Sequence, residues 1–292
     1  MSVLELAGRS VELTTPDRVL WPAVGFTKRD LLHYYLRVAP VLLPHLADRP
    51  LTLGRFPHGV EGRGFAQTEC RDAPEWLRTE PIRLRNGEIR NYCVVEDEAG
   101  LAWLANRSAI ELHPFLGLDR PHAVVFDLDP GEPADVVDCA EVALLLRERL
   151  GGDAVVKTSG SVGLHVFAAT TAEYEETRAF ARDVAEELER AHPDLVVSTT
   201  DRAARAGRVL VDWMQNASMR STVAPYSLRA APWPTASTPV AWEEVERAVA
   251  ERRPELLTFL AGDVVERVAR LGDLFRYPYG YGDAVQAFAR TR

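Results

Sequence analysis

The turn TSGSVG at residues 158–163 constrains the fold more than any other stretch of this sequence. It joins two short apolar segments, AVVK at 154–157 and LHVFAA at 164–169, whose β-branched and aromatic residues predict strands. A parallel crossover needs about a dozen residues or more, so strands joined this closely must pair antiparallel. The sequence therefore predicts a hairpin at the centre of its longest structured region.

The segments around this hairpin extend it into a larger core. Apolar periodicity and segment length predict two helices, at 135–150 and 173–191, and three further strands, at 123–128, 196–199 and 208–213. This order favours an α+β fold, with a mixed or antiparallel sheet flanked by helices, over a doubly wound parallel sheet.

Net charge and cysteine content indicate which binding partners and which cellular compartment to expect. The net charge of −9 argues mildly against a nucleic-acid partner, because phosphate binding rests on Lys and Arg, although arginines gather near 83–90 and 202–208. Cys70, Cys93 and Cys139 are widely spaced and form no metal-binding or CxxC pattern, which predicts buried thiols in a reducing cytoplasm. No apolar stretch approaches the roughly 20 residues of a membrane span, so we expect no membrane partner.

The stretch VVFDLDPG, at 124–131, places two carboxylates at the end of an apolar strand. Side chains alternate along a strand, so Asp127 and Asp129 should share one face, about 7 Å apart, with Leu128 on the other. Two like charges this close are tolerated in water, or with a cation between them. One interpretation is therefore a solvated strand end that opens a turn, because Asp-Pro-Gly is also good turn chemistry.

Two chemical interpretations compete with the solvated turn. In a phosphatase of the haloacid dehalogenase type, the first Asp of a D-x-D motif is a nucleophile, but that family usually has Thr or Val where this chain has Pro130. In a nucleotidyl transferase, the pair would hold two divalent ions between an attacking hydroxyl and a triphosphate. The second interpretation requires a third carboxylate on another strand and a cradle for the triphosphate.

Both requirements have candidates in the sequence. VLVDW at 209–213 carries a single acid, Asp212, on an otherwise apolar strand, where a lone carboxylate needs a partner. In KTSGSVGLHV, Gly160 and the second glycine allow a tight turn whose backbone N–H groups can face an anion. Ser159 adds a hydroxyl and His165 lies on the strand that leaves the turn.

Taken together and in this order, these motifs resemble the polymerase domain of bacterial DNA ligase D, in the archaeo-eukaryotic primase superfamily. The likeness includes VVFDLDPG, KTSGSVGLHV, VDWMQN, TVAPYSLRA, TPVAWEEV and, upstream, TPDRVLWPAVGFTK and ELHP, so it spans roughly residues 10–250. It implies a single primase-polymerase domain, with an N-terminal α/β module at 1–115, a catalytic core at 116–240 and a helical tail at 241–292.

The resemblance implies a site residue by residue. Asp127, Asp129 and Asp212 would hold divalent ions, Mn²⁺ or Mg²⁺, and activate a primer 3′-hydroxyl. The incoming nucleoside triphosphate would contact residues from four segments, namely His113, Ser159, Gly160, His165, Arg205, Gln215 and Arg229. The implied activity is template-dependent primer extension for gap filling and end processing in DNA break repair, with a preference for ribonucleotides.

The residues implied in DNA binding match the family less completely. Arg18 and Lys28 would grip a 5′-phosphate beside the gap, Phe65 would stack on template bases, and Arg55 would also bind DNA. Four positions lack the basic or aromatic residue usual in the family, namely Gly54, Ala66, Thr68 and Val162. We therefore expect weaker or more partner-dependent binding of a gapped duplex, and the first alternative is a weakly active or non-catalytic paralogue that binds DNA ends or partners.

The absence of a ligase motif has consequences for partners. No KxDG-type adenylation motif is present, so the resemblance predicts a stand-alone polymerase. Such a protein would associate with the nucleoid in the cytoplasm and cooperate with Ku and a separate DNA ligase.

Overall fold

The computed structural model describes residues 2–151 and 153–275, which form two compact units, each built from separate stretches of the chain. Unit 1 contains residues 2–115, 221–237 and 259–272, and unit 2 contains 116–220, 238–258 and 273–275. Among these residues, no helix is both long and apolar enough to cross a lipid bilayer.

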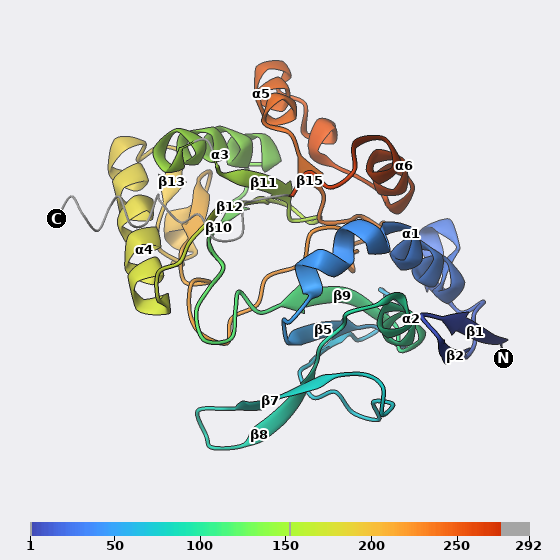
Figure 1. Ribbon diagram of the computed structural model, residues 1–292. Helices are drawn as coiled ribbons and strands as arrows, with labels where there is room; N and C mark the ends of the chain where they lie inside the picture. Colours follow the sequence, from blue (N-terminus) through green and yellow to red (C-terminus); the bar gives the residue numbers. More distant parts are fainter. Residues whose placement is uncertain (1, 152, 276–292) are drawn as a thin grey trace. The chain divides into compact units, whose positions relative to one another are not determined.

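Unit 1 combines a five-stranded sheet with three helices and two small hairpins. The sheet runs in the order β6-β5-β8-β7, and β9 pairs with β5 on a separate path. The hairpins are β1–β2 and β3–β4. Figure 1 shows the β7–β8 hairpin projecting away from α1. The elements are β1 (Ser2–Leu6), β2 (Arg9–Leu13), β3 (Val19–Trp21), β4 (Phe26–Thr27), α1 (Lys28–Leu46), β5 (Leu51–Arg55), β6 (Phe65–Gln67), β7 (Thr79–Arg83), β8 (Ile89–Cys93), α2 (Glu98–Asn106), β9 (Ala109–Pro114) and α6 (Ala261–Leu271).

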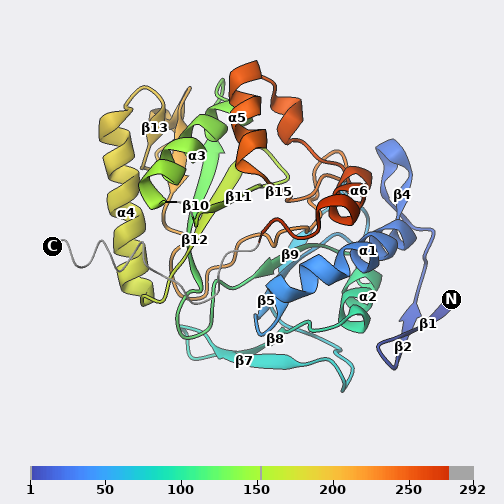
Figure 2. The ribbon, with the colours of Figure 1, turned by 45° about the horizontal axis from the view of Figure 1, so that its top comes forward.

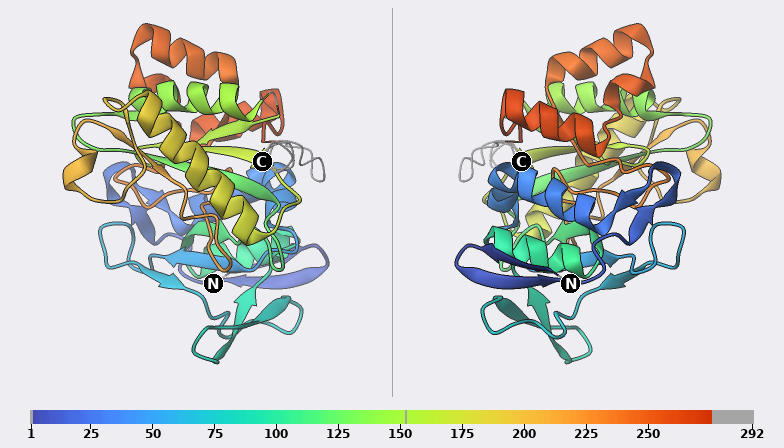
Figure 3. Two further views of the ribbon diagram at one scale, coloured as in Figure 1. Left: turned by 90° about the vertical axis from the view of Figure 1, so that its left-hand side faces the viewer. Right: turned by 90° about the vertical axis from the view of Figure 1, so that its right-hand side faces the viewer.

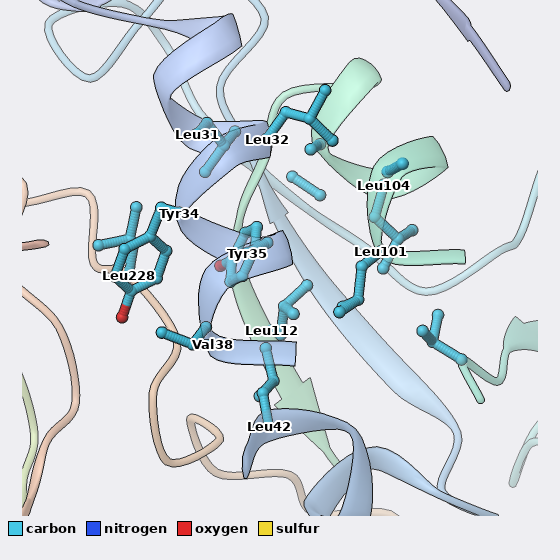
Figure 4. Packing of buried hydrophobic residues seen from close by; sticks show 14 of the residues in the cluster. Leu31, Leu32, Tyr34, Tyr35, Val38, Leu42, Leu101, Leu104, Leu112 and Leu228 are labelled. Atoms are coloured by element: carbon cyan, nitrogen blue, oxygen red, sulfur yellow. The ribbon is translucent and has the colours of Figure 1, made fainter. Parts of the chain in front are cut away.

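Helix α1 is the central element of the core of unit 1. It begins with a capping box, in which the Thr27 hydroxyl accepts the Asp30 N–H and the Asp30 carboxylate accepts the Thr27 N–H. One face of α1 packs on α2, and the two helices lie side by side in Figure 2. Figure 4 shows Tyr35 of α1 among Leu101 of α2 and Leu112 of β9, and its hydroxyl donates to the Ile110 carbonyl at 2.6 Å. The Tyr35 hydroxyl is thus paired within an apolar core.

Unit 2 is built on a six-stranded sheet in the order β13-β14-β10-β12-β11-β15. All seven elements that the sequence predicts between 123 and 213 are observed within two residues of the predicted bounds, and β11 and β12 form the expected antiparallel hairpin. Only β13 and β14 pair parallel, so the sheet is mixed and the predicted α+β fold is confirmed. The elements are β10 (Ala123–Pro130), α3 (Val136–Leu150), β11 (Val155–Thr158), β12 (Leu164–Ala169), α4 (Tyr174–Ala191), β13 (Val196–Val197), β14 (Val209–Asp212), β15 (Pro239–Val240) and α5 (Trp242–Glu251).

Helices α3 and α4 cover one face of this sheet. Both contact β10, and they contact each other through Arg149 and Glu187, whose Nε and Oε2 atoms lie 3.0 Å apart. Figures 1 and 3 show the two helices beside the strands from three directions. Leu128 is fully buried and its carbonyl accepts from the Cys139 thiol of α3, so the helices lie on the Leu128 face. Asp127 and Asp129 therefore point to the opposite face.

The structure corrects the predictions for the cysteines and for the end of β10, and it describes only part of the predicted helical tail. Cys70 and Cys93 form a disulfide, so the prediction of three free thiols was wrong, and among the described residues only Cys139 is a free cysteine. Strand β10 continues through Pro130 rather than ending at 128, because Asp129 and Pro130 still pair with β14. The predicted tail helices are observed as α5 and α6, whereas YPYGYG at 277–282 lies outside the described residues.

Candidate active site

Three strands of unit 2 bring acidic and basic side chains into one row. Asp127 of β10 stands directly opposite Asp212 of β14 on one side and opposite His165 of β12 on the other. Residues directly opposite in an antiparallel pair point to the same face of a sheet. Asp129 lies two residues beyond Asp127 and shares this face. The pairing register thus gathers the three predicted carboxylates and the predicted histidine from three separate sequence motifs.

His165 links the carboxylate row to a lysine that sequence analysis did not single out. The Nε2 atom of His165 lies 3.0 Å from Oδ1 of Asp127. Its Nδ1 atom lies 3.0 Å from Nζ of Lys157, which stands opposite His165 on β11 and is fully buried. A lysine at the end of an apolar strand, paired through the hairpin with a histidine, was the sequence signal for this contact.

Asp129 lies beside the segment that carries the predicted Arg205. Its Oδ2 atom is 4.0 Å from Nη2 of Arg205, which ends the 3-10 helix Ala203–Arg205. This approach depends on Gly131, because a Cβ there would lie 1.9 Å from the Arg205 carbonyl oxygen. The Gly131 N–H also donates to the Arg208 carbonyl at 2.8 Å. Glycine after the D-L-D-P motif thus lets this arginine-bearing segment reach the carboxylates.

Asp212 is held at the end of β14 by its own downstream turn. Its Oδ1 atom accepts the Met214 N–H at 2.8 Å, and Nε2 of the predicted Gln215 lies 3.5 Å from its Oδ2. Burial raises the pKa of Asp212, and the charge of Asp127 raises it further, while the Met214 N–H and the charges of Arg220 and Arg205 act in the opposite direction. Arg220 is a second residue beside the site that sequence analysis did not select.

The predicted cradle is a turn organised by the Ser159 hydroxyl. Its oxygen accepts the backbone N–H groups of Ser161 and Gly163, at 3.1 and 3.0 Å. Gly160 has a φ of +71°, which favours glycine, and a Cβ at Gly163 would lie 1.9 Å from the Leu128 carbonyl oxygen. The turn therefore lies against β10, close to the carboxylates. Val162 is 59% exposed and occupies the position where the family usually has a basic residue.

The donor chemistry of the carboxylate row fits hard divalent cations, which prefer carboxylate oxygens. Across residues 2–151 and 153–275, however, no three His, Cys, Asp or Glu side chains converge as a preformed metal site. Each carboxylate turns toward a partner of its own, Asp127 to His165, Asp129 to Arg205 and Asp212 to Met214. The register supplies the ligands, and side-chain rotation would be needed to bring them onto an ion.

In unit 1, the predicted His113 and Arg229 meet at a glutamate that sequence analysis did not select. Oε2 of Glu111 lies 3.0 Å from Nε2 of His113, and Oε1 accepts from Nε of Arg229 and the Ala230 N–H, each at 3.0 Å. Burial alone would raise the pKa of Glu111, but the His113 contact, the charge of Arg229 and the Ala230 N–H together lower it to about 2. Glu111 therefore stays ionised and orients two predicted nucleotide contacts.

Glu111 and His113 line an open cavity of about 420 Å³ in unit 1, together with Gly54, Phe65, Ala66 and Ser221. A Cβ at Gly54 would lie 2.8 Å from Cβ of Glu111, its cross-strand neighbour on β9. The glycine thus lets Glu111 occupy the space above β5. A larger side chain at 54 would displace the residue that orients His113 and Arg229.

The predicted DNA contacts of unit 1 form a cationic group. Lys28 is only 3% exposed, and its Nζ donates to the Thr14 carbonyl at 2.8 Å, so it is not a solvated helix-end charge. Burial first, and then the charges of Arg18 and Arg55, together lower the pKa of Lys28 to about 8. Mutual repulsion among three cations favours an anion beside them.

The predicted aromatic contact belongs to the same region. Phe65 is 47% exposed, and the Arg55 guanidinium lies 5.4 Å from its ring centroid. At the neighbouring departure from the family pattern, Thr68 accepts from Nη1 of Arg90 at 3.2 Å. An arginine from β8 therefore lies beside the threonine that replaces the usual lysine.

Comparison with known proteins identifies the family of this chain. A sequence model of the LigD primase-polymerase domain matches residues 27–275. The multifunctional non-homologous end joining DNA repair protein LigD of Mycobacterium tuberculosis H37Rv is 39% identical over 282 residues, which cover 90% of this chain and 36% of that protein. The bifunctional non-homologous end joining protein LigD of Bacillus subtilis is 31% identical over 92% of this chain and 44% of its own length.

A solved structure shares the fold as well. The polymerase domain of Mycobacterium tuberculosis ligase D, solved in complex with DNA, superposes with a TM-score of 0.83 at 37% identity and covers 90% of this chain and 96% of that domain. The chain spans little more than a third of the length of the mycobacterial LigD proteins that it matches. It belongs to the LigD primase-polymerase domain family and is, like the members of that family, a nucleotidyltransferase of the polymerase type.

Proposed function

We propose that this chain extends a primer on a DNA template by two-metal nucleotidyl transfer. The observation that carries the proposal is the register of β12, β10 and β14, which places Asp127 between His165 and Asp212 on the face opposite the helices. Polymerase chemistry requires several carboxylates at one place, and a solvated turn has no need of a third acid on a neighbouring strand.

Asp127, Asp129 and Asp212 are the residues that would hold Mn²⁺ or Mg²⁺. When bound, such ions lower the pKa of an attacking hydroxyl and neutralise charge on a triphosphate. The chain's own residues have separate tasks. Arg205 beside Asp129 and Arg220 near Asp212 add positive charge where phosphate charge would develop. The raised pKa of Asp212 supports the same role, because a cation would relieve its repulsion from Asp127.

We propose candidate nucleotide contacts within each unit taken by itself. In unit 2, the turn with Ser159 and Gly160 and the side chains of His165, Arg205 and Gln215 would contact the triphosphate. In unit 1, His113 and Arg229 would contact the base, sugar or phosphates, oriented by Glu111. We further propose a preference for ribonucleotides.

We propose that DNA binds to unit 1 through Arg18 and Lys28, which would hold the 5′-phosphate of a gap, and through Arg55 and Phe65, which would meet template bases. Stacking on an exposed aromatic ring suits sequence-tolerant binding. Gly54, Ala66, Thr68 and Val162 remove cation and stacking surface, so the isolated chain should bind a gapped duplex more weakly than relatives with the full set. This leaves the binding of DNA ends without efficient catalysis as the second candidate function.

In the cell, we propose that the activity fills gaps and processes ends during non-homologous end joining on nucleoid DNA. Ku and a DNA ligase activity would then supply end recognition and sealing. This part of the proposal rests on the similarity of the chain to LigD proteins of non-homologous end joining.

The deciding experiment is primer extension on a duplex with a short gap and a 5′-phosphate, with Mn²⁺ or Mg²⁺ and with ribo- or deoxyribonucleotides. We expect extension that depends on the template and on the metal, and that is lost when Asp127→Ala and Asp129→Ala are combined. If the wild-type protein binds the duplex but does not extend it, whichever nucleotide or metal ion is supplied, the second candidate function is favoured. Release of phosphate from small phosphomonoesters without DNA would instead support the phosphatase interpretation.

A further inference from the structure

The motif TVAPYSLRA at 222–230 begins as a strand-like segment beside β9, within unit 1. The Thr222 N–H donates to the Pro114 carbonyl at 3.4 Å, and the Ala224 N–H donates to the Leu112 carbonyl at 2.8 Å. The two bonds advance by two residues in opposite directions along the two stretches, as they do in an antiparallel ladder. The first half of the motif therefore extends the sheet of unit 1 at the free edge of β9.

A β-turn then takes the chain away from β9. The Ser227 N–H donates to the Ala224 carbonyl at 3.2 Å, which closes a turn with Pro225 and Tyr226 at its centre. Proline followed by a residue with positive φ is the pattern of a type II turn, and Tyr226 has a φ of +65°. Glycine is the residue that ordinarily occupies this position, so the surrounding structure must hold the tyrosine there. The Tyr34 hydroxyl of α1 does so in part, because it donates to the Tyr226 carbonyl at 2.8 Å.

The turn interrupts the ladder, so β9 has other partners at this edge. The Tyr226 N–H would be the next donor in the ladder and would face the Ile110 carbonyl, but it donates to the Ser237 carbonyl at 2.6 Å. The Ile110 carbonyl accepts instead from the Tyr35 hydroxyl of α1, also at 2.6 Å. A side-chain hydroxyl thus takes the place of a backbone N–H.

The Ser227 hydroxyl makes the complementary replacement at the next position of β9. Ser227 is fully buried, and its Oγ accepts the Leu112 N–H at 2.9 Å. The same hydroxyl donates to the Leu228 carbonyl at 3.1 Å, so it is used both as acceptor and as donor. A buried backbone N–H that lost its acceptor would destabilise the pairing. The hydroxyl therefore replaces a strand carbonyl and holds the register between β9 and the motif.

This register determines whether Glu111 can join two predicted nucleotide contacts. Glu111 directly precedes the residue whose N–H the Ser227 hydroxyl accepts, and Arg229 is the second residue after Ser227. Oε1 of Glu111 accepts from Nε of Arg229 and from the Ala230 N–H, and Oε2 lies 3.0 Å from Nε2 of His113. Displacement of either backbone would separate the guanidinium and the imidazole from their shared carboxylate.

We propose that Ser227 is a positioning residue for nucleotide binding, whose hydroxyl fixes the Glu111 bridge between His113 and Arg229. Groups that are already held in place need no reorganisation when a charged ligand arrives. The role in nucleotide binding rests on the proposed function. The positioning of the bridge does not, because it is a property of the folded chain without nucleotide.

The first test uses hydrogen exchange and NMR spectra of the chain without nucleotide. In Ser227→Ala, we expect the Leu112 amide to exchange at least about tenfold faster than in the wild type, after correction for the change in global stability. The Nε–H signal of Arg229 should shift as well, because its contact with Glu111 loosens. Val38→Ala is the matched control, since it leaves a cavity in the same core and removes no hydrogen bond of this edge. An unchanged Leu112 amide or an unchanged Arg229 signal in folded Ser227→Ala would overturn the proposal.

The second test separates nucleotide binding from turnover. We expect Ser227→Ala to raise the KM for nucleotide by about tenfold and to leave kcat within about threefold, because loosened contacts weaken the binding of the substrate itself. Val38→Ala should leave this KM within about twofold, although it also lowers stability. Equal increases of KM in the two variants would show that the effect comes from lost stability and not from lost positioning.

Failure of the two proposals can be separated. If the wild-type protein extends no primer, the proposed function fails, and the exchange and Arg229 measurements still decide the positioning role. If the wild type extends primers and these signals do not change in Ser227→Ala, only the role of Ser227 fails. Should Ser227→Ala not fold, Ser227→Cys nearly keeps the volume and replaces a strong acceptor with a weak one. We expect the same changes in smaller size, and their absence in the folded Cys variant would also overturn the proposal.

Discussion

Asp127 and Asp212 stand directly opposite each other in the antiparallel pair of β10 and β14, so two acids from motifs 85 residues apart share one face of the sheet. Like charges directly opposite across a strand pair destabilise a sheet. The raised pKa of Asp212 reports burial first and this repulsion as well. The fold tolerates this repulsion at a single point of its sheet, where the proposed chemistry needs the charges.

Replacing Asp212 with Asn should therefore separate stability from activity. The amide keeps the shape but removes the buried charge, so we expect the free energy of unfolding to stay the same or rise by up to about 1 kcal/mol. Primer extension should fall at least about a hundredfold, because one of the three proposed metal ligands is lost. Urea unfolding and extension rates check the two effects. A clear loss of stability would show that Asp212 is a structural residue.

Binding of a 5′-phosphate end should depend on pH through Lys28. Its pKa of about 8 means that the ammonium form predominates below pH 8 and is lost above it. A phosphate favours the charged form, so affinity should be nearly constant between about pH 7 and 8, where the phosphate is a dianion, and fall by up to about tenfold per pH unit above pH 8. Fluorescence anisotropy with 5′-phosphate and 5′-hydroxyl duplexes measures this difference. Lys28→Arg cannot lose its proton and should show no such decline, and an identical decline in that variant would exclude Lys28 as its cause.

Glu111 should stabilise the folded chain only while it is ionised. Its pKa of about 2 in the fold lies below the ordinary value of 4.5, so its contribution is complete above pH 4.5 and is lost as the pH falls toward 2. We expect Glu111→Gln to lower the free energy of unfolding at pH 7 by about 1–3 kcal/mol, with the difference shrinking below pH 4.5. Urea titrations from pH 3 to 7 would check this, with the exposed Glu148→Gln as a control that changes little.

The Cys70–Cys93 disulfide should add to the stability of unit 1. It closes a loop with a sequence separation of 23, for which chain-entropy estimates give about 3 kcal/mol. We therefore expect a reducing agent to lower the urea midpoint of the wild-type chain. Cys93→Ser should have the lower midpoint under both conditions. Wild-type protein whose midpoint and free-thiol count do not respond to the reductant would contradict a formed bond.

The proposed loss of positive charge at the nucleotide-binding turn can be tested by introducing a basic residue. Val162 is exposed in the turn between Ser159 and Gly163, where the family usually has a cation. Val162→Lys should lower the KM for nucleotide by about threefold or more at low salt, with a smaller effect at high salt because exposed charges are screened. Val162→Gln is the matched control without charge. Equal effects of Lys and Gln would indicate that polarity, not charge, was missing.

Local signals in the sequence predicted most of the elements that position the site. The apolar run before Asp127 and the short turn at 158–163 act over a few residues, so they can be seen without the fold. Strand ends were less certain, because Pro130 remains in β10 only through its pairing with β14. The roles of the predicted site residues stay predictions.

Long-range partners could not be predicted from the sequence. Lys157 and Glu111 occur in stretches that were already under consideration, yet their importance depends on neighbours, His165 across a hairpin and Arg229 more than a hundred residues away. The disulfide was missed for a similar reason, because pairing between Cys70 and Cys93 depends on how β8 folds back beside the loop before β7. Such contacts depend on the register of paired strands and on how distant segments of the chain fold back on one another.

Gly131 and Gly163 fix the positions at which neighbouring backbone segments approach the end of β10. Each lets a neighbouring stretch of backbone come so close that an added methyl group would lie 1.9 Å from a carbonyl oxygen. The loops that start from these two points can change in length and sequence over evolution, but the points of closest approach are fixed. We therefore expect sequence variation in these loops to increase with distance from Gly131 and Gly163. A design that introduces new loops here should keep both glycines.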